Sequence, residues 1–180
     1  MSNNLILTGY PGVGKTTLIK KIVNYLQSKH IEVTGFYTEE VRKDTKNRIG
    51  FDVITLEGKQ GVLARTKEHT NEESKHYVGQ YLVFPDQLES LVLPLFQIPA
   101  KVIVIDEIGK MELFSDKFKT EVTNLFKSKS KLIIATIPVK KGYPIKFVED
   151  IRENPQNDVI MVNRENRNKL FNEIITKLRY

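Results

Sequence analysis

The stretch NLILTGYPGVGKTTLIKKIVNYLQSK, from Asn4 to Lys29, decides the fold of this 180-residue chain. It begins with a short apolar run, continues through a turn that contains three glycines, and ends in apolar residues at the spacing of one helix face. These parts are Leu5–Leu7, Gly9–Gly14 and the series Leu18, Ile22 and Leu26. The stretch therefore predicts a strand, a loop and a helix in that order.

The turn itself has the spelling of a phosphate-binding loop. Its residues GYPGVGKT match G-x-x-x-x-G-K-[ST] at every fixed position. In that pattern the glycines let backbone N–H groups turn inward around an anion, the lysine reaches the β- and γ-phosphates, and the last hydroxyl binds magnesium. A glycine-rich turn with an exposed lysine is the alternative, but the strand and helix predicted on either side favour a phosphate loop. The predicted nucleotide-binding residues are Gly9, Tyr10, Pro11, Gly12, Val13, Gly14, Lys15 and Thr16, with Lys15 also catalytic.

A second chemical signal is VIVIDEIG, from Val102 to Gly109, where an apolar strand ends in two adjacent carboxylates. In P-loop enzymes an aspartate at the end of a neighbouring strand helps to hold the magnesium, so we predict that Asp106 and Thr16 bind Mg²⁺. Glu107 is the predicted catalytic base, because hydrolysis needs a group that orients or deprotonates the attacking water. The alternatives are a strand-end acid without a role and, for Glu107, a salt bridge to a lysine, since adjacent strand residues point to opposite faces.

The segment between the two motifs predicts an antiparallel part of the sheet. A strand is predicted from Ile31 to Arg42, and RIGFDVITLEGKQGVLAR contains two β-rich runs separated by a turn at 57–60, which is typical of a hairpin. HYVGQYLVF is predicted as a third antiparallel piece that ends at Pro85. We therefore interpret residues 36–84 as an antiparallel meander that extends a parallel core.

After the meander the chain returns to alternating helices and strands. A helix is predicted over 85–96, although Pro94 should end or kink it. The elements predicted after it are a strand at 102–106, a helix over 115–127 with Ser115 as N-cap, a strand at 132–136, an amphipathic element at 147–152, a strand at 159–162 and a closing helix over 170–178. This order predicts an α/β fold with three layers and a mostly parallel central sheet. The length predicts one domain, residues 1–180.

Composition excludes several classes of site and of protein. The chain contains no cysteine, which excludes disulfides, thiolate catalysis and cysteine zinc sites, and its three histidines are scattered. No apolar run approaches the ~18 residues of a membrane-spanning helix, and the first residues do not have the form of a signal peptide. We therefore expect a cytoplasmic protein, active as a monomer and without a membrane partner. The net charge of +6 leaves a nucleic-acid partner open, although the lysines are spread along the chain.

Several cations are candidates for stabilising charge in the transition state. An arginine can act from the same chain or from a partner, and the sequence offers Arg42, Arg152, Arg164 and Arg167 without indicating which one reaches the site. Lys110, three residues after Glu107, is a further candidate. Thr136 ends the apolar strand LIIAT and is a candidate sensor of the γ-phosphate or the water. For each of these, a solvated or merely structural side chain is the alternative.

With both motifs in place, the chain resembles the nucleoside-triphosphatase family described from thermophiles and also known as cancer-related nucleoside-triphosphatases. The resemblance rests on TGYPGVGKTTL, GFYTEEVR, RIGFDVITLEG, VIDEIGKMELFS, TIPV and NRENRNKL, which are distributed over nearly the whole chain. It implies a RecA-like P-loop core and magnesium-dependent hydrolysis of ATP, GTP and other nucleoside triphosphates with little base selectivity. It further implies nucleotide contacts from Gly9–Thr16 and from the segment Val102, Ile103, Val104, Ile105, Asp106, Glu107, Ile108 and Gly109.

Three other activities share the P-loop. A nucleotide or polynucleotide kinase would need an acceptor pocket, for which the meander offers Arg42, Arg48 and Arg65. A signalling GTPase matches DEIG, but no N-K-x-D motif follows it. A nucleic-acid-stimulated ATPase is supported only by the basic charge.

Overall fold

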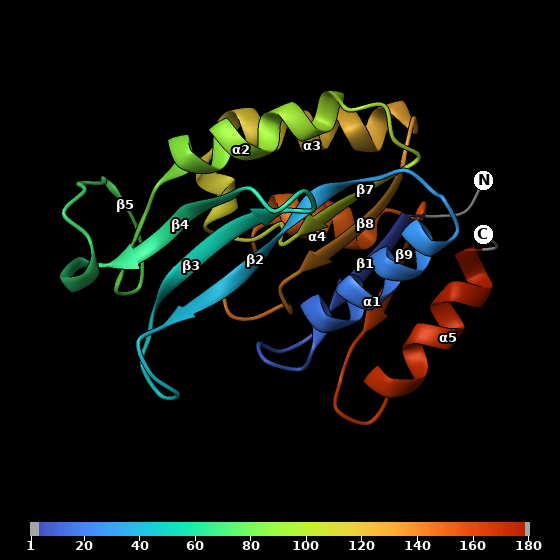
Figure 1. The fold of residues 1–180 in the computed structure, drawn as a ribbon, viewed down its shortest axis with the longest axis horizontal. Helices are drawn as coiled ribbons and strands as arrows, with labels where there is room; N and C mark the ends of the chain where they lie inside the picture. Colours follow the sequence, from blue (N-terminus) through green and yellow to red (C-terminus); the bar gives the residue numbers. More distant parts are fainter. Residues whose placement is uncertain (1–3, 179–180) are drawn as a thin grey trace.

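The computed structural model describes residues 4–178, which form one mixed sheet covered by helices on both faces (Figure 1). The strands are β1 (Asn4–Thr8), β2 (Val33–Arg42), β3 (Arg48–Thr55), β4 (Gln60–Thr66), β5 (His76–Val78), β6 (Tyr81–Val83), β7 (Val102–Asp106), β8 (Leu132–Ile137) and β9 (Asn157–Met161). The helices are α1 (Lys15–Ser28), α2 (Pro85–Gln97), α3 (Asp116–Ser128), α4 (Lys146–Glu153) and α5 (Arg167–Leu178), with short 3₁₀ turns η1 (Lys67–His69) and η2 (Glu112–Phe114). The strand order is β5-β6-β4-β3-β2-β7-β8-β1-β9.

The parallel half of the sheet consists of β2, β7, β8, β1 and β9. The apolar run of β7 explains why this half is buried on both faces. Ile103 and Ile105 pack in the core on the side of α2, α3 and α4, whereas Val102 and Val104 pack on the side of α1 and α5. A strand that is buried on both faces is apolar at every position, and this produces the three-layer α/β fold predicted from the sequence.

The antiparallel half confirms the predicted extension of the core but corrects its last piece. β3 and β4 form the predicted hairpin, and β3 pairs with β2. HYVGQYLVF is not one strand, because Gly79 takes a positive φ of 58° and turns the chain between β5 and β6. β6 then pairs with β4 and leaves β5 at the sheet edge, so the strands do not follow one another in chain order.

Of the two effects predicted for Pro94, ending or kinking its helix, the first is wrong, because α2 continues through Pro94 to Gln97. Pro94 is exposed near the C-terminal end of α2, and its missing N–H removes one hydrogen bond to the preceding turn. Leu95 and Phe96 are buried in the core immediately after it. Their burial holds the last turn in helical form.

The parallel pairing of the central strands positions the site. β1, β7 and β8 are parallel, so their carboxyl ends meet at one edge of the sheet, which is where open α/β sheets bind ligands. The helix that follows β7 begins as predicted, because the Ser115 hydroxyl accepts a hydrogen bond of 2.9 Å from the N–H of Phe118. Within residues 4–178, no helix has both the length and the apolar character needed to span a bilayer.

Candidate active site

The loop between β1 and α1 has the backbone shape of an anion-binding turn. Gly12 and Gly14 have φ values of 76° and 105°, which side-chain-bearing residues rarely adopt. Helix α1 begins at Lys15, directly after the turn, so the unpaired N–H groups of its first turn face whatever lies in the loop. A helix N-terminus of this kind attracts phosphate.

Lys15 lies inside the loop rather than in solvent. Its Nζ donates to the carbonyl oxygens of Gly9 at 2.8 Å and Tyr10 at 3.4 Å, and the residue is only 9% exposed. The alternative of an exposed lysine is therefore excluded by its position. A buried ammonium at the centre of an anion-binding turn is suited to a phosphate group.

Asp106 connects three elements at the carboxyl edge of the sheet. One of its carboxylate oxygens accepts from the Thr16 hydroxyl at 2.6 Å, and the other accepts from the Thr136 hydroxyl at 2.5 Å. Burial raises the pKa of Asp106, while the two hydroxyl donors and the positive charge of Lys15 oppose that increase. The bond to Thr16 links β7 to the start of α1, although the two residues are 90 positions apart.

Thr136 therefore acts on Asp106 rather than on the open site. Thr136 is fully buried, and it lines neither of the two cavities, described below, that open at this edge of the sheet. The prediction of a sensor that reaches the γ-phosphate is not supported by this position. Instead the hydroxyl fixes the orientation of the carboxylate.

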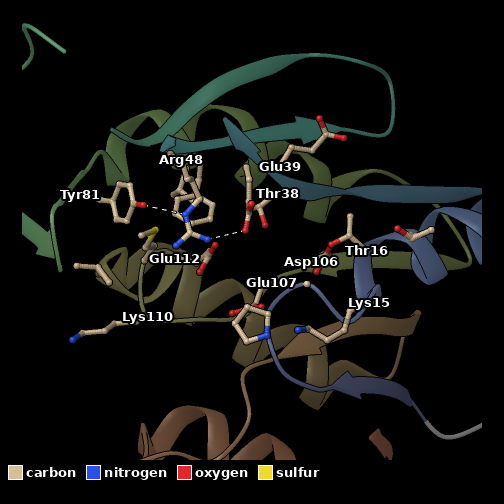
Figure 2. Close-up of a pocket in the computed structure, with 18 of the residues that line it drawn as sticks. Lys15, Thr16, Thr38, Glu39, Arg48, Tyr81, Asp106, Glu107, Lys110 and Glu112 are labelled. Atoms are coloured by element: carbon tan, nitrogen blue, oxygen red, sulfur yellow. Dashed lines mark hydrogen bonds and ion pairs between the residues drawn. The ribbon is translucent and has the colours of Figure 1, made fainter. Parts of the chain in front are cut away.

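Glu107 points into the open site beside Asp106 and Lys15 (Figure 2). Within residues 4–178 it makes no hydrogen bond and no salt bridge, so the predicted alternative of a lysine partner is not observed. Burial raises the pKa of the Glu107 carboxyl, the nearby charge of Lys15 lowers it, and that of Asp106 raises it again. An unpaired carboxyl group is thus held next to the phosphate loop.

Glu112, in η2, is a buried residue that lines the same site. Its Oε2 accepts from the Gly109 N–H at 3.1 Å, and the residue is 4% exposed. Burial raises the pKa of Glu112 to about 8, with the neighbouring Glu107 raising it further and the Gly109 N–H opposing the increase. A Cβ atom on Gly109 would lie 2.6 Å from Glu107 Oε1 and 3.2 Å from Glu112 Oε2. Gly109 is therefore the spacer between two carboxyl groups.

Two cavities open at this edge of the sheet. The larger, of about 790 Å³, extends from the phosphate loop past Asp106 and Glu107 towards the antiparallel half. The smaller, of about 310 Å³, lies between the phosphate loop and the segment from Pro138 to Val148. Both are lined by Pro11, Lys15, Glu107 and Lys110. The catalytic candidates thus stand where the cavities meet.

The comparisons with known proteins agree with this geometry. A family model described as NTPase matches residues 4–175. The chain belongs to this NTPase family. It is 45% identical over 183 residues to the cancer-related nucleoside-triphosphatase homolog of Mus musculus, with 97% of this chain and 96% of that protein covered. The family resemblance predicted from the sequence is confirmed.

Solved structures within the NTPase family have the same fold. The crystal structure of THEP1 from the hyperthermophile Aquifex aeolicus matches with a TM-score of 0.85 and 38% identity, over 98% of this chain and 99% of that one. The solution structure of a human cancer-related nucleoside triphosphatase matches with a TM-score of 0.83 and 44% identity, over 98% of this chain and 97% of that one. The predicted P-loop α/β fold is confirmed by both.

In this NTPase-family chain the second motif divides into core residues and site residues. Asp106 and Glu107 line the larger cavity, and Gly109 is buried beside them. The apolar members of the motif are buried in the core and line neither cavity; they are Val102, Ile103, Val104, Ile105 and Ile108. Their contribution is to hold the strand that carries the two carboxylates.

The four arginines predicted as candidates lie outside the larger cavity. Arg42 is exposed and pairs with Glu40, and Arg164 is exposed at the start of the last loop. Arg152 donates to the carbonyl oxygen of Pro138, and Arg167 donates to that of Val13 at 3.3 Å. Both therefore support loops at the edge of the site.

The structure instead places Arg48 in the lining of the larger cavity, together with Tyr81 and Glu112. Arg48 is one of the arginines that the sequence offers for the kinase alternative, whereas the sequence does not predict Glu112 or Tyr81 as site residues. The only signal for Glu112 is its position five residues after Glu107 in DEIGKMEL. Nothing local in the sequence marks Tyr81.

Proposed function

We propose that this chain hydrolyses nucleoside triphosphates, including ATP and GTP, to nucleoside diphosphate and phosphate in a magnesium-dependent reaction. The observation that carries the proposal is the joint position of Lys15, Thr16, Asp106 and Glu107 in the lining of one cavity. The family relatives named as nucleoside-triphosphatases support the same reaction. Each residue then has a separate part in it.

The phosphate loop binds and orients the triphosphate. Its backbone N–H groups and the N-terminus of α1 attract the negative charge, and Lys15 neutralises the β- and γ-phosphates. Because these contacts are to phosphate and not to the base, they support the low base selectivity that we propose. Phosphoryl transfer depends mostly on such positioning and charge stabilisation.

The residues present fit a magnesium ion. The Thr16 hydroxyl and the Asp106 carboxylate are neighbouring oxygen donors, 2.6 Å apart, and Mg²⁺ prefers oxygen ligands from one or two side chains together with phosphate oxygens. Within residues 4–178, no group of three or more His, Cys, Asp or Glu side chains is arranged to hold a metal ion by itself. When bound, the ion would neutralise charge on the β- and γ-phosphates. The Thr136 hydroxyl keeps Asp106 oriented towards that position.

Glu107 orients the attacking water and accepts its proton. A carboxyl group without a protein partner beside Lys15 has a free oxygen to accept a hydrogen bond from water. Burial raises the pKa of the Glu107 carboxyl above its ordinary value, which makes the carboxylate a stronger proton acceptor.

Phosphate release from ATP, GTP, CTP and UTP, measured with magnesium and with chelator, tests the proposal. Lys15→Ala should lose both nucleotide binding and turnover, whereas Lys21→Ala, on the exposed face of the same helix, should lose neither. Glu107→Gln should retain nucleotide binding while hydrolysis falls about 100-fold or more. Release that is unaffected by chelator, or a normal rate in either site variant, would contradict the mechanism.

A second candidate is stimulation of the same hydrolysis by single-stranded nucleic acid. Tyr10 and Tyr143 are 57% and 101% exposed, and Lys141 lies 5.6 Å from the Tyr10 ring centroid. Exposed aromatic rings beside lysines bind single strands by base stacking and phosphate contacts. An increase in phosphate release on adding single-stranded oligonucleotides, lost in Tyr143→Ala, would support it, and an unchanged rate would exclude it.

A further inference from the structure

The larger cavity does not end at the catalytic residues. It continues past Glu107 into the antiparallel half of the sheet, where the lining comes from β2, β3, β4, β5, β6 and the loops beside them. The lining residues there include Thr38, Glu40, Arg48, Phe51, Leu63 and Tyr81. At about 790 Å³ the cavity is within the range of small-molecule sites, roughly 300–1,000 Å³. A single water molecule, at about 30 Å³, needs only a small part of it.

Arg48 forms a fixed flat wall at the far end of this cavity. Its Nε donates to the Tyr81 hydroxyl at 3.0 Å, and one terminal nitrogen donates to Glu40 at 2.7 Å (Figure 2). The guanidinium carbon lies 4.9 Å from the ring centroid of Phe51 and 5.6 Å from that of Tyr81. Guanidinium planes stack on flat rings, so this arrangement is suited to a planar ligand.

Glu107 lies between the phosphate loop and the far end of the cavity. In the sheet, β7 is two places from β1, and β2 and β3 lie beyond β7. Glu107, at the end of β7, therefore stands between the phosphate loop and Arg48. Because Glu107 is the proposed base, a hydroxyl group that enters from the Arg48 side would meet Glu107 before it reaches the phosphate loop.

The charges at the far end favour an uncharged ligand. Arg48 is already paired with Glu40, which also binds the exposed Arg42. Lys110 lines both cavities, and its ammonium group points away from Arg48 in Figure 2. Outside the phosphate loop the lining contains three cations, Lys20, Arg48 and Lys110, and the carboxyl groups of Glu39, Glu40, Glu107 and Glu112. It therefore has no excess positive charge to balance a phosphate group.

We propose that this part of the cavity binds a nucleoside, with its base stacked on the Arg48 wall, and that its hydroxyl group accepts the γ-phosphoryl group in place of water. The inference rests on the proposed function, because the triphosphate donor, the phosphate loop and the general base Glu107 are the same in both reactions. The hydroxyl oxygen forms the new bond to phosphorus, the bond to the leaving diphosphate breaks with its electron pair, and the hydroxyl proton passes to Glu107. The products are a nucleoside monophosphate and a nucleoside diphosphate.

Transfer of label from γ-³²P-ATP tests the inference. The full chain is incubated with magnesium and separately with nucleosides, nucleoside monophosphates or glycerol, and labelled products are separated from free phosphate. Label in a nucleoside monophosphate, with none in glycerol phosphate, is the expected result. Label only in free phosphate, at an undiminished rate, would overturn the acceptor while leaving the proposed hydrolysis standing; transfer only to monophosphates would overturn the acceptor class. If no label is released at all, the proposed function fails as well.

Substitutions of the two arginines that pair with Glu40 test where the acceptor binds. Arg48→Ala should lower transfer to the nucleoside about tenfold or more, the size expected for losing one stacking contact. Arg42→Ala removes the other arginine bound to Glu40 but does not line the cavity, and it should leave transfer unchanged. Tyr81→Phe keeps the ring and loses the hydroxyl that holds Arg48, so its KM for the nucleoside should rise. Equal losses in both arginine variants, or a raised KM for ATP in Arg48→Ala without acceptor, would refute the placement.

Discussion

Glu112 gives the sharpest prediction, because both the direction and the size of its effect on stability follow from its raised pKa. The folded protein holds this carboxyl with a pKa of about 8, whereas the ordinary value is 4.5. Between these values the unfolded chain releases the proton and the folded chain keeps it. Stability therefore falls as the pH rises from about 4.5 to 8, since the folded state binds more protons than the unfolded state.

The size of the destabilisation follows from the difference between pH 7 and the ordinary pKa of 4.5. Each pH unit in that interval corresponds to about 1.4 kcal/mol, so Glu112 should destabilise the fold by about 3 kcal/mol at pH 7. Glu112→Gln does not titrate, and its amide oxygen can still accept the Gly109 N–H. We expect this variant to be about 3 kcal/mol more stable than the parent at pH 7, and the gap to narrow as the pH falls towards 4.5.

Urea unfolding followed by circular dichroism at pH 5, 6, 7 and 8 measures the effect. Glu173→Gln, an exposed glutamate on α5, is the matched control and should follow the parent at every pH. Parallel pH profiles for the parent and Glu112→Gln would refute the reasoning, because they would mean that Glu112 titrates alike in both states. A narrowing gap towards low pH would confirm it.

Three further predictions concern residues around the site. Gly109→Ala should slow hydrolysis about tenfold or more with an unchanged circular dichroism spectrum, because the new methyl group would displace Glu107; a normal rate would contradict the spacer role. Thr136→Val should raise the magnesium concentration needed for half-maximal hydrolysis about tenfold or more, the usual effect of losing a group that orients a metal ligand; an unchanged magnesium titration would show that Asp106 does not need it. Ser115→Ala should lower the free energy of unfolding by about 1 kcal/mol, measured by urea unfolding, through loss of the helix cap, and an unchanged urea midpoint would mean that the cap does not contribute.

The shape of the loop from Gly9 to Thr16 was predictable because its residues are neighbours in the chain. Gly9 to Thr16 form one turn whose shape depends on local glycine conformations and on the helix that follows. The α/β class was predictable for a similar reason, since apolar runs and helical spacing are local patterns. The split of HYVGQYLVF into β5 and β6 was not, because the pattern contains apolar residues on both sides of Gly79 and only the backbone turn divides them.

The sequence by itself therefore determined the phosphate loop, the carboxylate pair at the end of β7 and the layered α/β fold, all of which are encoded within short segments. Only the tertiary structure decided that Thr136 holds Asp106, that Glu112 is a buried residue lining the same cavity as Glu107, and that Arg48 rather than the other arginines lines the cavity. These contacts join distant parts of the chain, such as Arg48 and Tyr81, 33 positions apart. Which distant side chains meet depends on strand order and pairing, and no local pattern of residues contains that information.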